Sequence, residues 1–370
     1  MYIYQHKNWP QWKWGQNEVN QLLIVLIGKQ QHFLGKLEGL GFDVREKTAL
    51  ESEIKDILNN SEIEGNQLQE SQIRSSIAKN LGIDSDEPIN KSIETEGAIN
   101  LYLDATRNFK AELTSERLFD WHAGLFPTGR SAGIKIEVAN YRSSSEPMQI
   151  VSGAMGRESF DKLRIHYEAP ASSQVPKMMD ELIEYINNSK DHSYIKACIA
   201  HLWFEVIHPF EDGNGRIGRA IVDKLLCEAD DSTFRYYSFS STILKDTKAY
   251  YNELNKASFD TMDITPWINW VLHLIIESIE FSEKILQKVD LKRQFWEKNQ
   301  ETVLNIRQQK VLKKLLDNSE IKINSDRWSR INKCTKMTAT RDINDLIEKG
   351  IFVKSESGGR STYYQINWYE

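Results

Sequence analysis

The segment 208–219 constrains this chain more than any other, because it joins two stretches that both have the periodicity of a helix. Apolar residues recur at helical spacing through residues 193–207 and again through residues 216–229. Gly213 and Gly215 lie between these stretches, and they let the backbone turn tightly and approach a ligand closely. The sequence therefore predicts a helix, a tight loop and a second helix that opens from a glycine-rich turn.

The side chains of this loop have the chemistry of a phosphate site. A Gly-Asn-Gly turn that opens a helix directs backbone N–H groups and the positive end of the helix dipole toward one point, which favours an anion. Arg216 and Arg219 can both reach that helix end and bind phosphate oxygens. Asp212 is a hard oxygen ligand of the kind that Mg²⁺ takes beside phosphates, and His208 can accept a proton near neutral pH. A structural turn would explain any one of these residues, but the whole set predicts phosphoryl or nucleotidyl transfer.

The string His-x-Phe-x-[Asp/Glu]-Gly-Asn-Gly-Arg-x-x-Arg starts at His208 and resembles the core motif of the Fic (filamentation induced by cAMP) family at all eight fixed positions. Such a string arises at a given start by chance with a probability of about 10⁻¹⁰. The resemblance implies a protein adenylyltransferase that moves AMP from ATP to a Ser, Thr or Tyr hydroxyl of a protein. It implies that His208 deprotonates the hydroxyl, Asp212 holds Mg²⁺ and Arg219 binds the γ-phosphate. The other phosphates would be cradled by Gly213, Asn214, Gly215 and Arg216.

The segment 60–66 resembles the inhibitory helix that many Fic proteins carry before their core. In that pattern a Ser or Thr precedes, by four residues, a Glu that is followed by Gly or Asn. Glu64 and Gly65 match it, but the position four before Glu64 is Asn60. The resemblance implies that Glu64 pairs with Arg219 and blocks the seat of the γ-phosphate. The alternative is a solvated carboxylate at the end of a helix.

Two further regions have candidate functions by the same resemblance. Residues 149–167 read as two short strands and would form the β-hairpin flap that positions a target segment by strand addition. Just before them, alternating apolar residues at 134–138 predict a half-buried strand. Tyr251, on a helical segment, would contact the adenine, although packing in the core is the alternative for this residue.

Composition places the chain among soluble globular proteins, with 40% hydrophobic and 27% charged residues. No stretch approaches the roughly 20 apolar residues of a membrane span, and the N-terminus does not have the pattern of a secretory signal. Cys198, Cys227 and Cys334 are far apart and odd in number, as expected for buried thiols in a reducing compartment. We therefore expect a cytoplasmic protein with no membrane partner.

The last part of the chain differs in charge. Residues 291–370 hold 16 Lys and Arg against 10 Asp and Glu, a net charge of +6 in a chain whose total is −6. The expected elements are helices over 302–317, 325–332 and 338–349, with Thr338 as a candidate cap, and strands over 351–354 and 363–366. This order is typical of a winged helix-turn-helix, which binds DNA or another protein.

The predicted fold is mainly α: a Fic-type helical bundle with a short β-hairpin flap, followed by the winged helix-turn-helix. Three regions are expected, namely an N-terminal helical region at 1–110 with the inhibitory segment, a catalytic core at 111–290 and the winged helix at 291–370. ATP is the expected substrate, Mg²⁺ the cofactor and a protein hydroxyl the acceptor, on the chain itself or on another protein. DNA and a second copy in a homodimer are candidate partners by analogy.

Two other functions remain open from the sequence. Glu64 could position a water molecule that removes AMP from a modified protein, so that the enzyme runs in reverse or in both directions. The chain could also be a DNA-binding regulator whose core senses ATP without transferring AMP.

Overall fold

The computed structural model describes residues 1–80, 92–152, 164–259, 261–317, 322–355 and 363–368 of the chain. The chain divides into two compact units, Met1–Glu283 and Lys284–Glu370. The predicted boundary near residue 110 falls within the first unit and stays a prediction, as does the assignment of three regions. Within the described parts of the chain, no helix is both long and apolar enough to cross a membrane.

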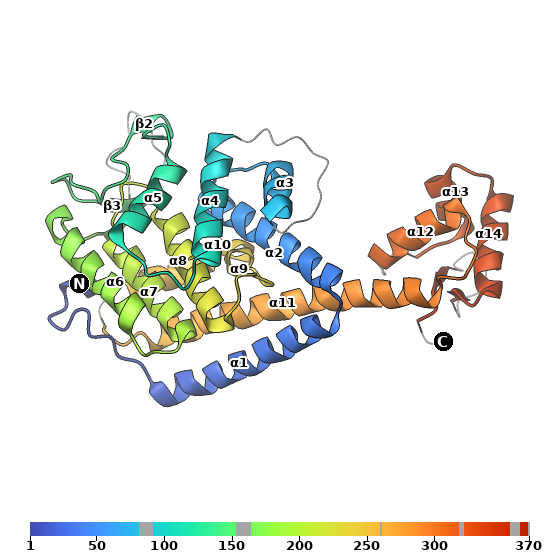
Figure 1. The fold of residues 1–370 in the computed structure, drawn as a ribbon, viewed down its shortest axis with the longest axis horizontal. Helices are drawn as coiled ribbons and strands as arrows, with labels where there is room; N and C mark the ends of the chain where they lie inside the picture. The colour runs from blue at the N-terminus through green and yellow to red at the C-terminus, as the bar shows by residue number, and fades with distance from the viewer. Residues whose placement is uncertain (81–91, 153–163, 260, 318–321, 356–362, 369–370) are drawn as a thin grey trace. The chain divides into compact units, whose positions relative to one another are not determined.

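The first unit is built from helices, which confirms the predicted mainly α fold (Figure 1). Helix α11 (Thr265–Lys298) begins in this unit and continues past Glu283. Short 3-10 turns lie at η1 (Ile3–Gln5) and η3 (Ser172–Gln174). The remaining helices are α1 (Gln16–Gly39), α2 (Phe42–Glu62), α3 (Glu70–Asn80), α4 (Ile93–Arg107), α5 (Ser115–Leu125), α6 (Val175–Asn188), α7 (Ser193–Ile207), α8 (Asn214–Asp230), α9 (Phe239–Lys245) and α10 (Thr247–Ala257).

Helices α7 and α8 pack against each other in the interior of the first unit (Figure 1). Every residue of α7 from Tyr194 to Ile207 is buried, as expected for a helix that is covered on all sides. In α8 the buried residues include Arg216 and Arg219. The loop 208–213 therefore joins two core helices, and its backbone is fixed by the packing of both.

Two antiparallel strand pairs lie among the described residues of the first unit. Strand β3 (Gln149–Ser152) pairs with β4 (Arg164–Glu168), in the predicted hairpin at 149–167, with Gln149 opposite Glu168. The residues between these strands, 153–163, lie outside the described part of the chain. Strand β1 (Arg130–Ser131) pairs with β2 (Ile134–Lys135) in a shorter hairpin.

The strand predicted over 134–138 is wrong beyond Lys135. The N–H of Ile136 still donates to the carbonyl of Gly129 at 3.1 Å, beside β1. After it, the N–H of Glu137 donates to a carboxylate oxygen of Glu211 at 2.9 Å, and that of Ala139 donates to Nδ1 of His122 at 3.3 Å. Because these donors serve side chains near the loop 208–213, they cannot continue a strand ladder.

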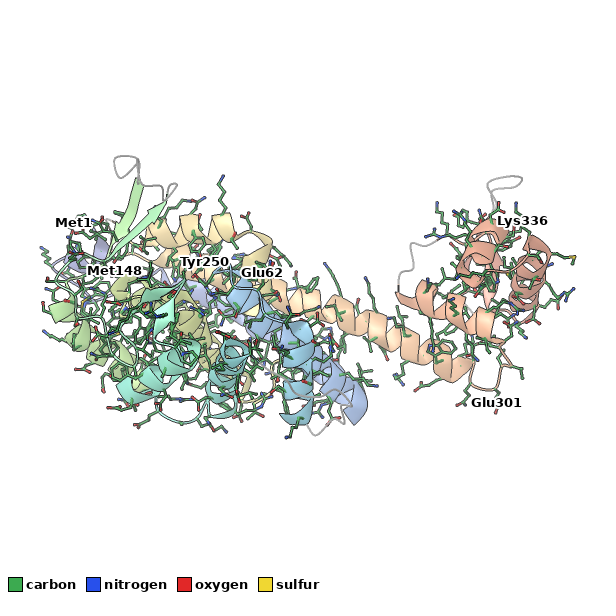
Figure 2. All side chains as sticks on the ribbon, turned by 90° about the horizontal axis from the view of Figure 1, so that it is seen from above. Met1, Glu62, Met148, Tyr250, Glu301 and Lys336 are labelled. Carbon is green, nitrogen blue, oxygen red and sulfur yellow. The ribbon has the colours of Figure 1, made fainter. Side chains whose placement is uncertain are left out.

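The first residues of the chain form an arm on this unit. Tyr2 forms a β-bridge with Phe259, and its ring contacts that of Tyr167 on β4 at 5.1 Å between centroids. Trp9 and Trp12 pack on Trp203 of α7. Figure 2 draws the side chains as sticks and labels Met1, Glu62, Met148 and Tyr250 in this unit.

The second unit has its own core, which includes the fully buried Trp328 and Ile343. Its elements are α12 (Ile306–Asp317), α13 (Ser325–Asn332), α14 (Lys336–Glu348) and the antiparallel strands β5 (Phe352–Lys354) and β6 (Tyr364–Ile366). This is the predicted order, although its assignment as a winged helix stays a prediction. The cap of α14 is Thr335 and not Thr338, because Thr338 donates its N–H to the Thr335 hydroxyl at 3.2 Å.

Candidate active site

The loop between α7 and α8 has a backbone that the sequence alone only partly predicts. His208 ends α7 in the left-handed region, with φ of 50°, and Gly213 precedes α8 with φ of 82°. Asn214 closes the loop on itself: its side chain accepts from the N–H of Phe210 at 2.9 Å and donates to the carbonyl of Phe210 at 2.8 Å. Both side-chain groups of Asn214 are therefore occupied by the loop, and its contribution to an anion site is its backbone N–H.

His208 is held by its backbone rather than by its ring. Its carbonyl oxygen accepts from Nε of Arg142 at 2.8 Å, and Arg142 also donates to the carbonyl of Pro170 at 2.5 Å. Burial, together with the positive charge of Arg142, lowers the pKa of His208 to about 4. The imidazole is therefore neutral at neutral pH, which is the state that a general base requires.

Asp212 presents a half-exposed carboxylate at the start of α8. Its Oδ1 accepts from the N–H of Gly213 at 2.6 Å and lies 3.9 Å from Nη2 of Arg216, while its Oδ2 accepts from the hydroxyl of Ser131. Its carbonyl oxygen is 3.1 Å from Nε2 of His122, which therefore acts as the donor because Nδ1 of the same ring accepts from Ala139. The carboxylate is fixed in place but still reachable from solvent.

Arg216 lies over the ring of Phe126, with 4.9 Å from its guanidinium carbon to the ring centroid. The side chain is 11% exposed, and its Nε has no hydrogen-bond partner among the residues that the structure describes. A buried guanidinium with an unused donor is an anion-binding group without its anion.

Arg219 is fully buried and its contacts come from the end of α2. Its Nη2 donates to Oε1 of Glu64 at 2.7 Å and to the carbonyl of Asn60 at 3.0 Å, and its Nε donates to the side chain of Asn60 at 2.6 Å. Burial by itself would lower the pKa of Arg219, but the carboxylate of Glu64 raises it. Asn60, where the inhibitory pattern has Ser or Thr, thus supplies two of the three oxygens that hold this arginine.

The carboxylate of Glu64 lies in the glycine-rich turn itself. A Cβ placed on Gly215 would collide with Oε1 of Glu64, and it would come within 3.0 Å of Nη1 of Arg219. The glycine therefore admits a carboxylate oxygen to the first turn of α8, where N–H groups have no partner within the helix. The place that the sequence assigns to a phosphate is filled by an anionic side chain of the chain itself.

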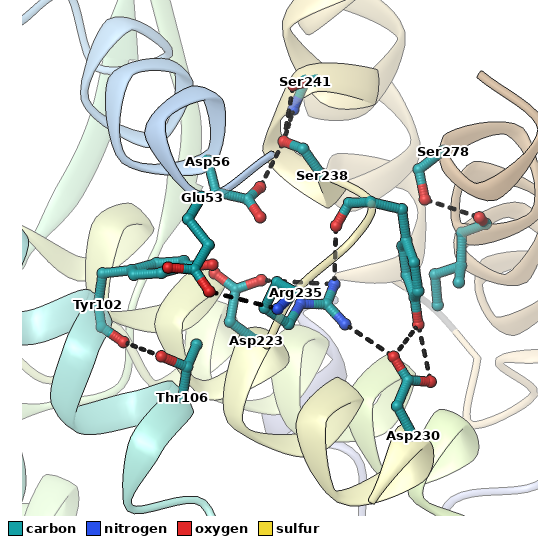
Figure 3. Close-up of polar contacts among 12 residues, drawn as sticks. Glu53, Asp56, Tyr102, Thr106, Asp223, Asp230, Arg235, Ser238, Ser241 and Ser278 are labelled. Atoms are coloured by element: carbon teal, nitrogen blue, oxygen red, sulfur yellow. Dashed lines mark hydrogen bonds and ion pairs between the residues drawn. The ribbon is translucent and has the colours of Figure 1, made fainter. Parts of the chain in front are cut away.

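Polar contacts anchor helix α2 to the rest of the first unit, and Figure 3 shows one of them, between Asp56 and Ser238. The contacts are Glu53 with Arg107, Asp56 with Ser238, and Asn59 with Ser241. Burial raises the pKa of Asp56, and the carboxylate of Asp223 on α8 adds to this rise. The position of Glu64 thus depends on a helix with several fixed contacts along its length.

Tyr251 is the other predicted contact residue. Its side chain is 45% exposed, whereas that of its neighbour Tyr250 is buried and bonds Nε2 of His201 at 2.9 Å. Burial of its hydroxyl raises the pKa of Tyr251 to about 12, and the charge of Glu64 adds to this rise. Tyr251 therefore lies near the anion site with an open face, while Tyr250 has the packing role.

The structure brings His208, Asp212, the glycine turn, both arginines and Glu64 into one site. Three residues of this site are absent from the sequence-based prediction: Ser131, Arg142 and Glu205. Ser131 and Arg142 contact the loop 208–219 from earlier segments of the chain, whereas Glu205 lies on the last turn of α7 before it. No motif in the sequence identifies these three residues. The sequence shows that Asn60 stands at the Ser or Thr position of the inhibitory pattern, but it does not predict the contact of Asn60 with Arg219.

Comparison with known proteins gives two family matches. The Fic/DOC family matches residues 112–226, which include the loop 208–219, and a domain of unknown function (DUF4172) matches residues 2–83, which include Glu64. The chain is similar over 94% of its length to a crystal structure of a Fic family protein from Desulfovibrio desulfuricans G20, of which 96% is covered, with a TM-score of 0.51 and 19% identity. This likeness concerns the fold.

Two curated relatives are similar over shorter segments. A probable protein adenylyltransferase of Aquifex aeolicus is 38% identical over 63 residues, which are 17% of this chain and 20% of the relative. The protein adenylyltransferase Fic of Nematostella vectensis is 31% identical over 117 residues, which are 30% of this chain and 25% of the relative. The chain thus spans a quarter or less of the length of these relatives.

Proposed function

We propose that this chain, which carries a Fic/DOC family domain at residues 112–226, transfers AMP from ATP to a Ser, Thr or Tyr hydroxyl of a protein and is inhibited by Glu64. Relatives named as protein adenylyltransferases support this reaction type. One observation carries the proposal: the carboxylate of Glu64 fills the glycine turn and pairs with Arg219 at 2.7 Å. A site that binds a carboxylate of its own chain at this distance is suited to bind the phosphates of a ligand.

Each residue of the loop has a separate role in the reaction. His208 accepts the proton of the target hydroxyl, because its imidazole is neutral at neutral pH. The oxygen then attacks the α-phosphorus, and the bond to pyrophosphate breaks. Arg216 and Arg219 bind phosphate oxygens, and the first-turn N–H groups of Asn214 and Gly215 stabilise the negative charge, while the N–H of Gly213 holds the carboxylate of Asp212. Tyr251 offers its open ring face to the base.

The residues present fit a magnesium ion of the kind that is shared with substrate. Asp212 contributes one carboxylate that is 44% exposed, and no group of three or more His, Cys, Asp or Glu among the described residues is placed to hold a metal without other ligands. Mg²⁺ commonly takes one or two carboxylates together with phosphate oxygens and water. When bound, it neutralises charge on the phosphates, and Ser131 would orient the carboxylate that holds it.

Inhibition follows from competition for Arg219. The γ-phosphate and Glu64 both require this guanidinium, which is fully buried and cannot turn to a second anion elsewhere. Losing one ionic anchor of a triphosphate costs about 2–4 kcal/mol, which is about 30- to 1000-fold in rate. Relief of inhibition therefore requires that Glu64 leave the turn, by movement of the end of α2.

The test uses purified protein, Mg²⁺ and α-labelled ATP with a cell lysate as the source of targets. Wild type, Glu64→Gly and Glu64→Gly/His208→Ala are compared. We expect label on protein with Glu64→Gly, little with wild type and none with the double variant. Absence of label from all three would overturn the proposal and favour removal of AMP, which is assayed by adding AMP-modified protein.

The proposal for the second unit is separate. The order of elements in Lys284–Glu370 and its net positive charge from residue 291 onward support binding of DNA. Met337 on α14 is 73% exposed, and Thr340 and Arg341 of the same helix line a shallow surface cavity. Operator binding whose affinity falls with salt, and which His208→Ala does not change, would test this role. A cytoplasmic location and a homodimer remain expectations of the same kind.

A further inference from the structure

Glu205 is a buried carboxyl group that the proposed reaction does not use. It lies on α7, three residues before His208, so the two side chains share one face of the helix. Its side chain is 7% exposed, and its Oε1 has no hydrogen-bond partner in the part of the chain that the structure describes. Leaving a buried polar atom unpaired is energetically costly, and such groups are found at functional sites.

Helix α8 provides the space for this carboxyl group. A Cβ placed on Gly218 would come within 2.7 Å of Oε1 of Glu205 and within 3.3 Å of Nδ1 of His201. A larger residue at this position would push the carboxyl group away from α8. The glycine thus keeps Glu205 next to the ring of His208.

The carboxyl group faces the ring nitrogen that the base does not use. Oε2 of Glu205 is 3.9 Å from Nδ1 of His208, and Nδ1 has no hydrogen-bond partner among the described residues. The backbone carbonyl of Glu205 also faces this ring as a weak acceptor and raises the pKa of His208, but its geometry does not meet that of a hydrogen bond. A separation of 3.9 Å is longer than a hydrogen bond, but catalytic contacts are commonly long in a structure without substrate and tighten in the reacting complex.

We propose that Glu205 is a positioning residue for His208, and this inference rests on the proposed AMP transfer. Its carboxylate accepts the Nδ1–H of the imidazole, which leaves Nε2 without a proton and able to accept one. When Nε2 takes the proton of the target hydroxyl, the carboxylate stabilises the imidazolium. Meanwhile the O–P bond forms at the α-phosphorus and the bond to pyrophosphate breaks. A base oriented by a third group is the arrangement of catalytic triads.

The charges around Glu205 connect this contact to the inhibitory one. Burial raises the pKa of Glu205 to about 8; Arg219 lowers it and Glu64 raises it. In the ligand-free protein, withdrawal of Glu64 therefore lowers this pKa and favours the carboxylate that His208 requires. Titratable and charged groups from neighbouring elements surround the pair. Arg219 on α8 and Glu64 after α2 act on Glu205, and Arg142 before β3 and Asp212 in the loop act on His208. The charge of Glu205 reaches Tyr250 on α10, and His201 on α7 lies beside it against Gly218.

The first test is kinetic and uses the Glu64→Gly protein as background. Glu205→Gln, Glu205→Asp and the control Glu228→Gln are compared for kcat and for KM of ATP between pH 5.5 and 9. Glu228 is a matched control because it also bridges α7 and α8, through Lys196 and Ser193 at the other end of the helices. Thermal melting shows whether each variant folds.

We expect Glu205→Gln to lower kcat about 100-fold with KM for ATP changed less than about 3-fold. In the background protein kcat/KM rises with pH as Glu205 ionises, and this rise disappears in Glu205→Gln. Glu205→Asp restores part of kcat, and Glu228→Gln matches the background. An unchanged kcat and an unchanged pH profile in Glu205→Gln would overturn the inference.

The second test does not depend on AMP transfer. Nuclear magnetic resonance of ¹⁵N-histidine-labelled, ligand-free protein reports which ring nitrogen of His208 carries the proton. We expect the proton on Nδ1 and a change in its signal as Glu205 ionises, and we expect that change to be absent in Glu205→Gln. If no variant transfers AMP while this change is seen, the proposed function fails and the contact stands. If AMP transfer is intact and the signals of the two proteins titrate alike, the positioning role alone fails.

Discussion

Two arginines of the first unit, Arg219 and Arg235, are both fully buried, yet their counter-ions differ in a way that separates binding from structure. Asp230 and Asp223 lie 3.3 Å and 3.9 Å from the guanidinium of Arg235. The side chains of both aspartates are 3% exposed or less and belong to α8, a core helix. The carbonyl of Tyr237 accepts from the same guanidinium at 3.3 Å. These partners cannot leave without unfolding the helix.

Arg219 has a different kind of partner. Its carboxylate, from Glu64, is 28% exposed and sits on the turn that ends α2, where Gly65 has φ of 79°. Nη1 of Arg219 has no hydrogen-bond partner within the described residues. A buried charge that is balanced by one carboxylate on a turn can exchange that carboxylate for a ligand. The exchangeability of the counter-ion, and not burial of the charge, therefore marks the ligand site.

The largest expected effect is on the structural arginine. Arg235→Met leaves two buried aspartates without their cation, so we expect the free energy of unfolding to fall by about 3–5 kcal/mol. Chemical and thermal denaturation measure this loss. Arg74→Met is the control, because Arg74 pairs at the surface with Glu51 and Glu70, and we expect at most about 1 kcal/mol there. Equal losses in the two variants would contradict the structural role.

The variant Glu64→Gly tests whether Glu64 is a counter-ion of Arg219 that a ligand can replace. We expect AMP incorporation to rise by about 30- to 1000-fold, because the γ-phosphate gains its anchor on Arg219. Mg²⁺ with ATP should also raise the melting temperature of this variant more than that of wild type, since ligand binding stabilises the folded state. Equal shifts with ATP in both proteins would show that Glu64 does not compete with the nucleotide. We do not expect Mg²⁺ with ATP to restore the melting temperature that Arg235→Met loses.

A smaller effect is expected at Asn60, which holds Arg219 alongside Glu64. Asn60→Ala removes the 2.6 Å bond to Nε of Arg219 but keeps the backbone carbonyl as a partner. A hydrogen bond to a charged group contributes about 1.5–3 kcal/mol, so we expect partial activation of about 10-fold. Asn60→Ser, which restores the residue of the inhibitory pattern, should stay inhibited. The same labelled-ATP assay measures both, and activation by Asn60→Ser equal to that by Asn60→Ala would argue against a specific contact.

The smallest effect is a pH dependence of stability in the buried network of Figure 3. Burial raises the pKa of Asp223 to about 6, while the nearby Arg235 lowers it. Because the folded state then binds a proton more tightly than the unfolded chain, stability from this group falls as pH rises from about 4 to about 6. Asp223→Asn removes this slope, which melting temperatures between pH 4 and 7 would reveal. Parallel curves for the two proteins would contradict the assignment.

The sequence predicted the parts of the fold that depend on local pattern. The helices on both sides of the loop 208–213 lie where their periodicity places them, and α13 matches the predicted helix 325–332 at both ends. Predictions failed where distant groups compete for the backbone. The strand expected over 134–138 ends at Lys135, and beyond Ile136 the N–H groups of Glu137 and Ala139 donate to the side chains of Glu211 and His122.

The candidate site was likewise predictable where it depends on local sequence and not where it depends on distant contacts. The residues of the loop 208–219 were identifiable because their chemistry is contiguous in sequence. Arg142 and Ser131 were not, because their contacts with His208 and Asp212 arise from tertiary packing between segments more than 60 residues apart. Glu205 is close to His208 in sequence, but only its burial against Gly218 distinguishes it from an ordinary helix carboxylate.

The most direct test of the central claim, that the turn filled by Glu64 is the phosphate site of a nucleotidyl transferase, uses two labels on one protein. The Glu64→Gly protein is incubated with Mg²⁺ and either α-labelled or γ-labelled ATP, and label on protein is counted with and without His208→Ala. The account predicts transfer of the α-label alone and its loss with His208→Ala. Transfer of the γ-label, or transfer of neither label, would contradict it.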